Sequence, residues 1–168
     1  MVTRTRRRTE RGAEAVEFAL ITVVLFPLLF GIIQYGIFFN DFLQARQAVR
    51  QGARSAVVLT TATCGGNAAN SALAFKCNTS AQASPVSGPV STYVATPNGW
   101  NVGQPLLVCQ AVKTVNVIGI LPLPNNGYAL AKTQMTIEQD TSTGATNPTG
   151  TFPANDTDPT GKSWSWCT

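Results

Sequence analysis

Side chains able to do chemistry are few in this chain, and their types exclude several kinds of active site. Histidine is absent, which excludes a Ser-His or Cys-His nucleophile pair and an imidazole ligand for zinc or iron. The sequence also contains no G-x-S-x-G, Walker A or G-x-G-x-x-G stretch. Four acidic residues near the C-terminus stand in polar sequence, where we expect solvated carboxylates: Glu138, Asp140, Asp156 and Asp158. We therefore expect no enzyme activity, no catalytic or cofactor-binding residue and no cofactor.

A metal site is not expected either. The stretch Asp156-x-Asp158-x-Thr160-Gly161 is similar to the start of a calcium-binding loop, but its twelfth position is Cys167, where such a loop requires glutamate. The cysteines include no C-x-x-C pair, and a zinc site has no histidine to draw on.

The four cysteines, Cys64, Cys77, Cys109 and Cys167, are candidates for disulfide bonds. All of them follow the long apolar segment described below. They are therefore expected on the exported side of the membrane, where disulfides persist. Four cysteines allow three pairings. The short loop between Cys64 and Cys77 favours a bridge there, which leaves Cys109 and Cys167 to tie the C-terminal tail to the rest of the domain.

A single acidic residue, Glu17, lies inside a run of almost wholly apolar residues at 15–39. As a helix this run would be about 38 Å long at ~1.5 Å per residue, which exceeds the ~30 Å hydrocarbon core of a bilayer. We therefore predict a membrane-spanning helix. A carboxylate inside such a segment costs up to about 2.5–3.5 kcal/mol at mid-membrane. Glu17 is therefore expected either to mark the interfacial end of the span or to have a specific partner.

The net charge of +4 is concentrated at the N-terminus. Five of the twelve basic residues lie in the first eleven positions, and the chain from Ala13 onward has equal numbers of basic and acidic residues. The five are Arg4, Arg6, Arg7, Arg8 and Arg11. By the positive-inside rule they keep the N-terminus in the cytoplasm and export everything after Asp41. The neutral remainder has no electrostatic footprint for nucleic acid, so no nucleic-acid partner is expected.

Helical periodicity continues beyond the apolar run, which predicts one helix from Ala13 to about Val58. Three arginines form one stripe, and a second stripe consists mostly of small residues: Ala45, Ala48, Val49, Gly52 and Ala56. The small stripe suits close approach either to this chain's own C-terminal domain or to other helices. Pro27 removes a backbone donor within the span and Gly31 follows it, so we predict a kink near residues 23–31.

Residues beyond the helix predict a small antiparallel sheet. Residues 67–76 suit a short helix, residues 90–95 suit a short strand, and the β-branched run 106–118 suits a longer strand. A turn signal at 122–127 separates that run from its predicted antiparallel partner at 128–139. The expected fold class is α+β, with a long N-terminal transmembrane helix packed on the sheet and a loop-rich, disulfide-stapled C-terminal region.

The N-terminal sequence resembles the processing site of type IV prepilins. A short basic leader ends in Gly12, Glu17 stands at the fifth position after it, and the aromatic Phe18 follows before the apolar run. Phe18 beside the glutamate is similar to the Flp, or type IVb tight-adherence, subgroup. The whole stretch is closest to the TadE-like family of minor pilins or pseudopilins; it reads RGAEAVEFALITVVLFPLLFGIIQYG.

The resemblance implies roles for these residues. A prepilin peptidase would cut between Gly12 and Ala13, and Glu17 with Phe18 would serve assembly. The Glu17 carboxylate would pair with the N-terminal amine of a neighbouring subunit, so that the two charges neutralise each other in an apolar environment. The partners implied are the prepilin peptidase, other pilin or pseudopilin subunits, the pilus assembly platform and membrane lipid. Pro27 and Gly31 match the helix-breaking residues that pilins use in this region.

The chain accordingly divides into four expected segments. They are a basic leader at 1–12, a long helix at 13–58, an exported α+β domain at 59–139 and an irregular extension at 140–168. The expected function is that of a minor pilin of a tight-adherence pilus, inserted in the bacterial cytoplasmic membrane and then carried into a pilus or to the cell surface. The alternatives are an uncleaved, membrane-anchored adhesion or binding protein and a minor pseudopilin of a type II-like secretion system.

Overall fold

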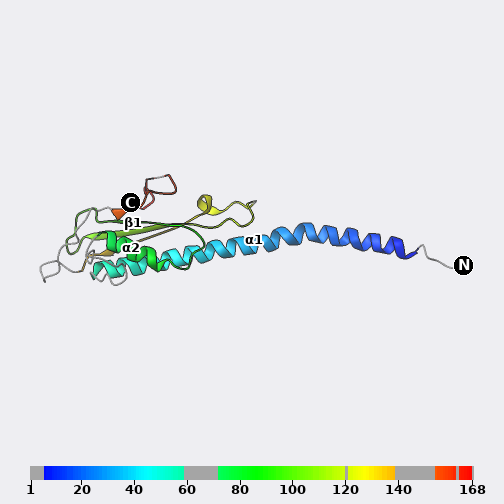
Figure 1. Cartoon of the computed structure of the whole chain (residues 1–168), viewed down its shortest axis with the longest axis horizontal. Helices are drawn as coiled ribbons and strands as arrows, with labels where there is room; N and C mark the ends of the chain where they lie inside the picture. Colours follow the sequence, from blue (N-terminus) through cyan, green and yellow to red (C-terminus); the bar gives the residue numbers. More distant parts are fainter. Residues whose placement is uncertain (1–5, 59–71, 120, 139–153, 162, 168) are drawn as a thin grey trace.

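The computed structural model describes residues 6–58, 72–119, 121–138, 154–161 and 163–167. The helices are α1 (Arg6–Val57), α2 (Ala72–Gln82) and the short 3-10 helix η1 (Pro124–Gly127). The strands are β1 (Val90–Ala95), β2 (Pro105–Lys113), β3 (Tyr128–Thr136) and the two-residue β4 (Ala154–Asn155). They form one antiparallel sheet in the order β3-β2-β1-β4. The C-terminal half of α1 lies along this sheet and the N-terminal half projects beyond it (Figure 1). The predicted α+β fold is confirmed.

The two main strands end earlier than the sequence predicts. β1 occupies the predicted residues, but β2 ends at Lys113 instead of Ile118, and β3 ends at Thr136 instead of Gln139. The last hydrogen bond between these two strands joins the Thr114 amide to the Gly127 carbonyl at 2.9 Å. Beyond it the chain leaves the sheet and runs along α1, where Gln34 binds the Val115 carbonyl. The β-branched residues beyond Lys113 therefore serve a loop. Likewise, α2 ends at Gln82, beyond the predicted Lys76, and residues 67–71 lie outside the described residues.

The turn before β3 depends on backbone conformations that few residues adopt. Asn125 and Asn126 have φ of 50° and 56°, and Gly127 has φ of 79°. Asparagine and glycine are the residues that tolerate this left-handed region best. The predicted turn at 122–127 is therefore present, although it takes the form of a distorted 3-10 turn.

The small stripe of α1 packs against this chain's own sheet and α2. Ala45, Ala48 and Ala56 are fully buried, and α1 packs on β2, β3 and α2. Gly52 allows the closest approach, because a Cβ on it would lie 2.1 Å from Thr79 Oγ1 of α2. The arginine stripe is exposed on the opposite face. Of the two expected uses of the small stripe, packing on the chain's own domain is therefore the one seen.

The C-terminal tail covers the other face of the sheet. Cys109 and Cys167 form a disulfide with Cα atoms 6.0 Å apart, which confirms the predicted pairing. Trp164 is buried and stacks on Tyr93 of β1 at a centroid distance of 5.3 Å. The tail is thus a third layer held by one covalent bond and by aromatic packing. Cys64 lies outside the described residues, so the structure does not test the predicted Cys64–Cys77 bridge.

The sequence predicted solvated carboxylates in the tail, but two of them are bound by other groups of the chain. Asp158 is 9% exposed and accepts from the backbone amides of Thr160 and Trp164, both at 2.8 Å. Asp156 accepts from the Thr92 amide at 3.0 Å and pairs with Lys76 of α2 at 2.5 Å. These carboxylates organise the tail because they satisfy backbone donors that its irregular path leaves open. Among the described residues no cluster of three potential metal ligands occurs.

Candidate processing site and membrane segment

The residues of the predicted processing site lie near the start of α1 and touch no other element. Gly12, Ala13, Glu17 and Phe18 are all exposed. A Cβ on Gly12 would meet no atom within 4 Å among the described residues, and Phe18 is 71% exposed. The structure therefore leaves this stretch free for partners. Because α1 already begins at Arg6, a peptidase that needs an extended substrate would have to unwind its first turns.

The apolar stretch that follows is exposed to an unusual degree for a soluble fold. Its most apolar 18-residue window has a mean hydropathy of 2.5, and none of that window is buried. The large side chains from Val16 to Ile33 are 44–72% exposed. α1 is the one helix in the described part of the chain that is long and apolar enough to cross a membrane. Exposing so large an apolar surface to water is unfavourable, and a bilayer would cover it.

α1 is continuous through Pro27, so the predicted kink does not interrupt the helix. Gly31 has a neighbour from a distant part of the chain, since Leu121 Cδ1 lies 4.0 Å from the position of a Cβ on it. Pro27 itself lines a cavity together with Leu121 and Ile118. The structure therefore places Pro27 and Gly31 beside a loop of the sheet domain.

The described residues of that loop are 114–119 and 121–123, and they are called the β2–β3 loop below. Gln34 of α1 is fully buried and binds it through both ends of its side-chain amide. Gln34 Nε2 donates to the Val115 carbonyl at 3.0 Å, and Gln34 Oε1 accepts from the Val117 amide at 2.9 Å. The next residue, Tyr35, donates its hydroxyl proton to the Pro122 carbonyl at 2.9 Å. The loop is thus fixed along α1 by polar side chains inside the apolar run.

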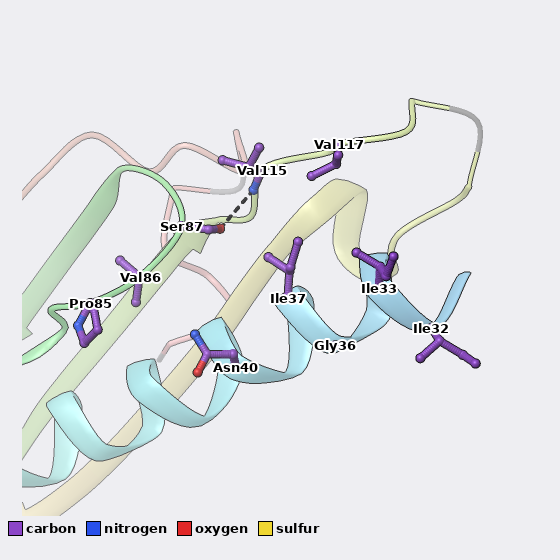
Figure 2. Close-up of a pocket in the computed structure, with 10 residues that line it drawn as sticks. All are labelled: Ile32, Ile33, Gly36, Ile37, Asn40, Pro85, Val86, Ser87, Val115 and Val117. Atoms are coloured by element: carbon purple, nitrogen blue, oxygen red, sulfur yellow. Dashed lines mark hydrogen bonds between the residues drawn. The ribbon is translucent and has the colours of Figure 1, made fainter. Parts of the chain in front are cut away.

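A second polar contact lies two turns further along α1. Asp41 is fully buried, accepts from the Ser87 amide at 2.9 Å, and also accepts from the Ser87 hydroxyl. The same hydroxyl oxygen accepts from the Val115 amide at 3.1 Å (Figure 2). Asp41, Ser87 and Val115 therefore form a chain of hydrogen bonds that links α1 to both the α2–β1 connection and the β2–β3 loop. Because Asp41 is fully buried, its carboxylate needs these partners.

An apolar groove runs between α1 and these two loops. It has a volume of about 750 Å³. Ile33, Gly36 and Ile37 form its α1 side, and Val86, Val115 and Val117 face them from the loops (Figure 2). It contains no pair of catalytic side chains, and its shape and lining suit an apolar chain.

The N-terminal part of the chain is similar to one known protein family. The family model for TadE-like proteins matches residues 12–54, from Gly12 almost to the end of α1. Residues 12–54 are similar to TadE-like proteins. No curated protein and no solved structure gives a significant match. This similarity associates the N-terminal part of the chain with the tight-adherence pilus. The match ends before α2 and the sheet, so these elements lie outside the matched residues.

Sequence reasoning missed the buried polar residues that join the TadE-like helix to the sheet domain. In the sequence, Gln34 had no predicted role, and Asp41 marked only the point after which the chain is exported. The available signal was their spacing, because positions seven apart fall on one face of a helix. Their partners are mostly backbone groups of loops, and no sequence pattern predicts which of those groups a side chain will bind.

Replacing Gln34 with leucine is expected to loosen the β2–β3 loop. The change removes both hydrogen bonds to the loop, each of which contributes about 0.5–1.5 kcal/mol. Hydrogen exchange at the Val117 amide should accelerate in detergent-solubilised protein while exchange in β2 stays slow. The exposed Gln47 offers a matched control, since Gln47→Leu should leave that exchange unchanged. Unaltered protection of Val117 in Gln34→Leu would show that the amide bridge does not fix the loop.

Proposed function

We propose that this protein is a minor pilin of a tight-adherence pilus. It is inserted through α1 with its N-terminus in the cytoplasm, cut by a prepilin peptidase between Gly12 and Ala13, and then used to prime, build or equip a filament. The observation that carries the proposal is the exposed apolar face of a TadE-like helix. Its large apolar side chains from Val16 to Ile33 remain 44–72% exposed, so a bilayer and afterwards other helices must cover them.

The position of Glu17 supports an assembly role. It lies at the start of the exposed apolar surface, and no described residue pairs with it. In a membrane or a filament the carboxylate would be surrounded by apolar side chains, where an unpaired charge is costly. After cleavage at Gly12, the new amine of Ala13 in a neighbouring subunit has the complementary charge. The acidic side chain is therefore a specific docking point that becomes useful once the leader is removed.

The experiment that tests the proposal measures the N-terminal mass of the protein produced with a prepilin peptidase. We expect a species that begins at Ala13. The matched control is a catalytically inactive peptidase, with which the leader should remain. Retention of Met1 or Val2 on all of the protein in the presence of active peptidase would refute processing. That outcome would favour the uncleaved, membrane-anchored adhesion protein.

A further inference from the structure

The β2–β3 loop reaches far along the apolar run of α1. Tyr35 binds its Pro122 carbonyl, and Leu121 lies beside Gly31. Further towards the N-terminus, Ile118 and Leu121 line a cavity of about 270 Å³ with Phe26 and Phe30. The loop thus lies alongside α1 from Gln34 to about Phe26. In Figure 1 it extends from the sheet along the middle of α1.

A bilayer that contains α1 cannot avoid this loop. A span of about 20 residues is needed to cross the hydrocarbon core. If the span ended before Phe26, it would have to begin near Arg6. Glu14 and Glu17 would then lie at its centre and the leader arginines inside it, which is where charged side chains are most costly. The exposed apolar residues after Phe26 would meanwhile remain in water. A span that begins near Ala15 avoids both penalties and ends near Gln34, with the loop alongside its last part.

Several polar groups of the loop have the protein partners that membrane depth requires. Non-helical backbone is tolerated in a bilayer only where its polar groups find partners in the protein. The Val115 carbonyl, the Val117 amide and the Pro122 carbonyl are bound by Gln34 and Tyr35. The side chain of Asn116, the one polar residue among the described positions 115–123, accepts from the Gly119 amide at 2.8 Å.

The side chains of the loop point to lipid as the covering partner. Val115 and Val117 are 45% and 61% exposed although they are β-branched and apolar. At the base of the loop, Lys113 Nζ lies 4.3 Å from the ring centroid of Tyr128. A tyrosine and a long cationic side chain suit the headgroup level of a bilayer. The loop therefore has an apolar tip and an amphipathic base. Its tip points along α1 towards the apolar N-terminal half of that helix.

We propose that the β2–β3 loop inserts with α1 into the membrane leaflet nearer the sheet domain, and that acyl chains occupy the grooves on either side of it. This inference rests on the membrane insertion of α1 that the proposed function requires. The loop and α1 together form a wider anchor than a single helix. Such an anchor fixes the height and the rotation of the sheet domain relative to the bilayer, because one helix alone is free to rotate about its axis.

Depth-dependent fluorescence quenching tests the proposal. A tryptophan is placed in the loop by Val117→Trp, and in a second variant by Val115→Trp. The full chain is reconstituted at low protein density in phosphatidylcholine–phosphatidylglycerol vesicles that contain acyl-brominated lipid. We expect the added emission to be blue-shifted and mostly lost to brominated lipid. Val102→Trp is the matched control, since Val102 is 50% exposed but lies in the β1–β2 connection beyond the far ends of the strands; its emission should persist.

A third position separates failure of the loop proposal from failure of the anchor. Val23→Trp places the probe on the exposed face of α1 itself. If Val23→Trp is quenched and both loop variants are not, the loop is outside the bilayer and the inference is overturned while the anchor stands. If none is quenched, the membrane anchor and the inference both fail. Blue-shifted loop emission that brominated lipid does not reduce would also overturn the inference, because a second copy of the chain would then cover the loop.

Discussion

Replacing Glu17 with alanine is expected to abolish filament assembly while leaving leader removal intact. Breaking a charge pair in an apolar environment by removing one partner costs about 3–5 kcal/mol, which lowers the equilibrium for subunit docking by a factor of about 100 or more. Cleavage should continue because the peptide bond after Gly12 lies more than a helical turn away. The measurements are the N-terminal mass of the membrane-bound protein and the amount of the protein recovered in sheared pilus fractions.

Glu14 provides the matched control for this experiment. It is also an exposed acidic residue of α1, one turn before Glu17, and lies outside the apolar run. Glu14→Ala should therefore leave both cleavage and assembly close to wild type. Normal incorporation of the Glu17→Ala protein would refute the pairing role, and loss of cleavage in that variant would instead assign Glu17 to peptidase recognition.

Replacing both Cys109 and Cys167 with serine is expected to lower the free energy of unfolding more than Gln34→Leu does. The bond closes a loop with a sequence separation of 58, and a loop of that length contributes about 4 kcal/mol through the entropy of the unfolded chain. The tail should then separate from the sheet and expose the Tyr93–Trp164 stack. Denaturant unfolding in detergent micelles, followed by tryptophan emission, should show a lower midpoint for the double variant.

Treatment with a reductant distinguishes the covalent effect from a packing effect of serine. Reduction should lower the unfolding midpoint of the wild-type protein by more than that of the double variant, because only the predicted Cys64–Cys77 bridge is left to reduce in the double variant. An unchanged midpoint in the double variant would show that aromatic packing and the contacts of Asp158 alone hold the tail against the sheet.

The fold was predictable where local pattern and tertiary environment agree. Residues 90–95 form the expected strand, and the small stripe of α1 is buried as a close-packing face. The prediction fails where a partner distant in sequence takes over. The β-branched run after Lys113 has strand propensity, yet Gln34 binds its backbone and draws it along α1. Asp158 looks like a solvated carboxylate in polar sequence, but three nearby donors around the tail's turns make it a buried acceptor.

The long apolar helix, its basic leader and the Gly12–Glu17–Phe18 spacing can be recognised in the sequence, because a continuous hydrophobic run and a short linear motif involve no distant residues. The sequence also favoured the Cys109–Cys167 bridge. The folded chain adds that the β2–β3 loop lies along the apolar half of α1 and that Gln34 and Asp41 hold the sheet domain to the helix. Those contacts join side chains to backbone groups of loops more than 40 positions away, and backbone groups are the same for every sequence.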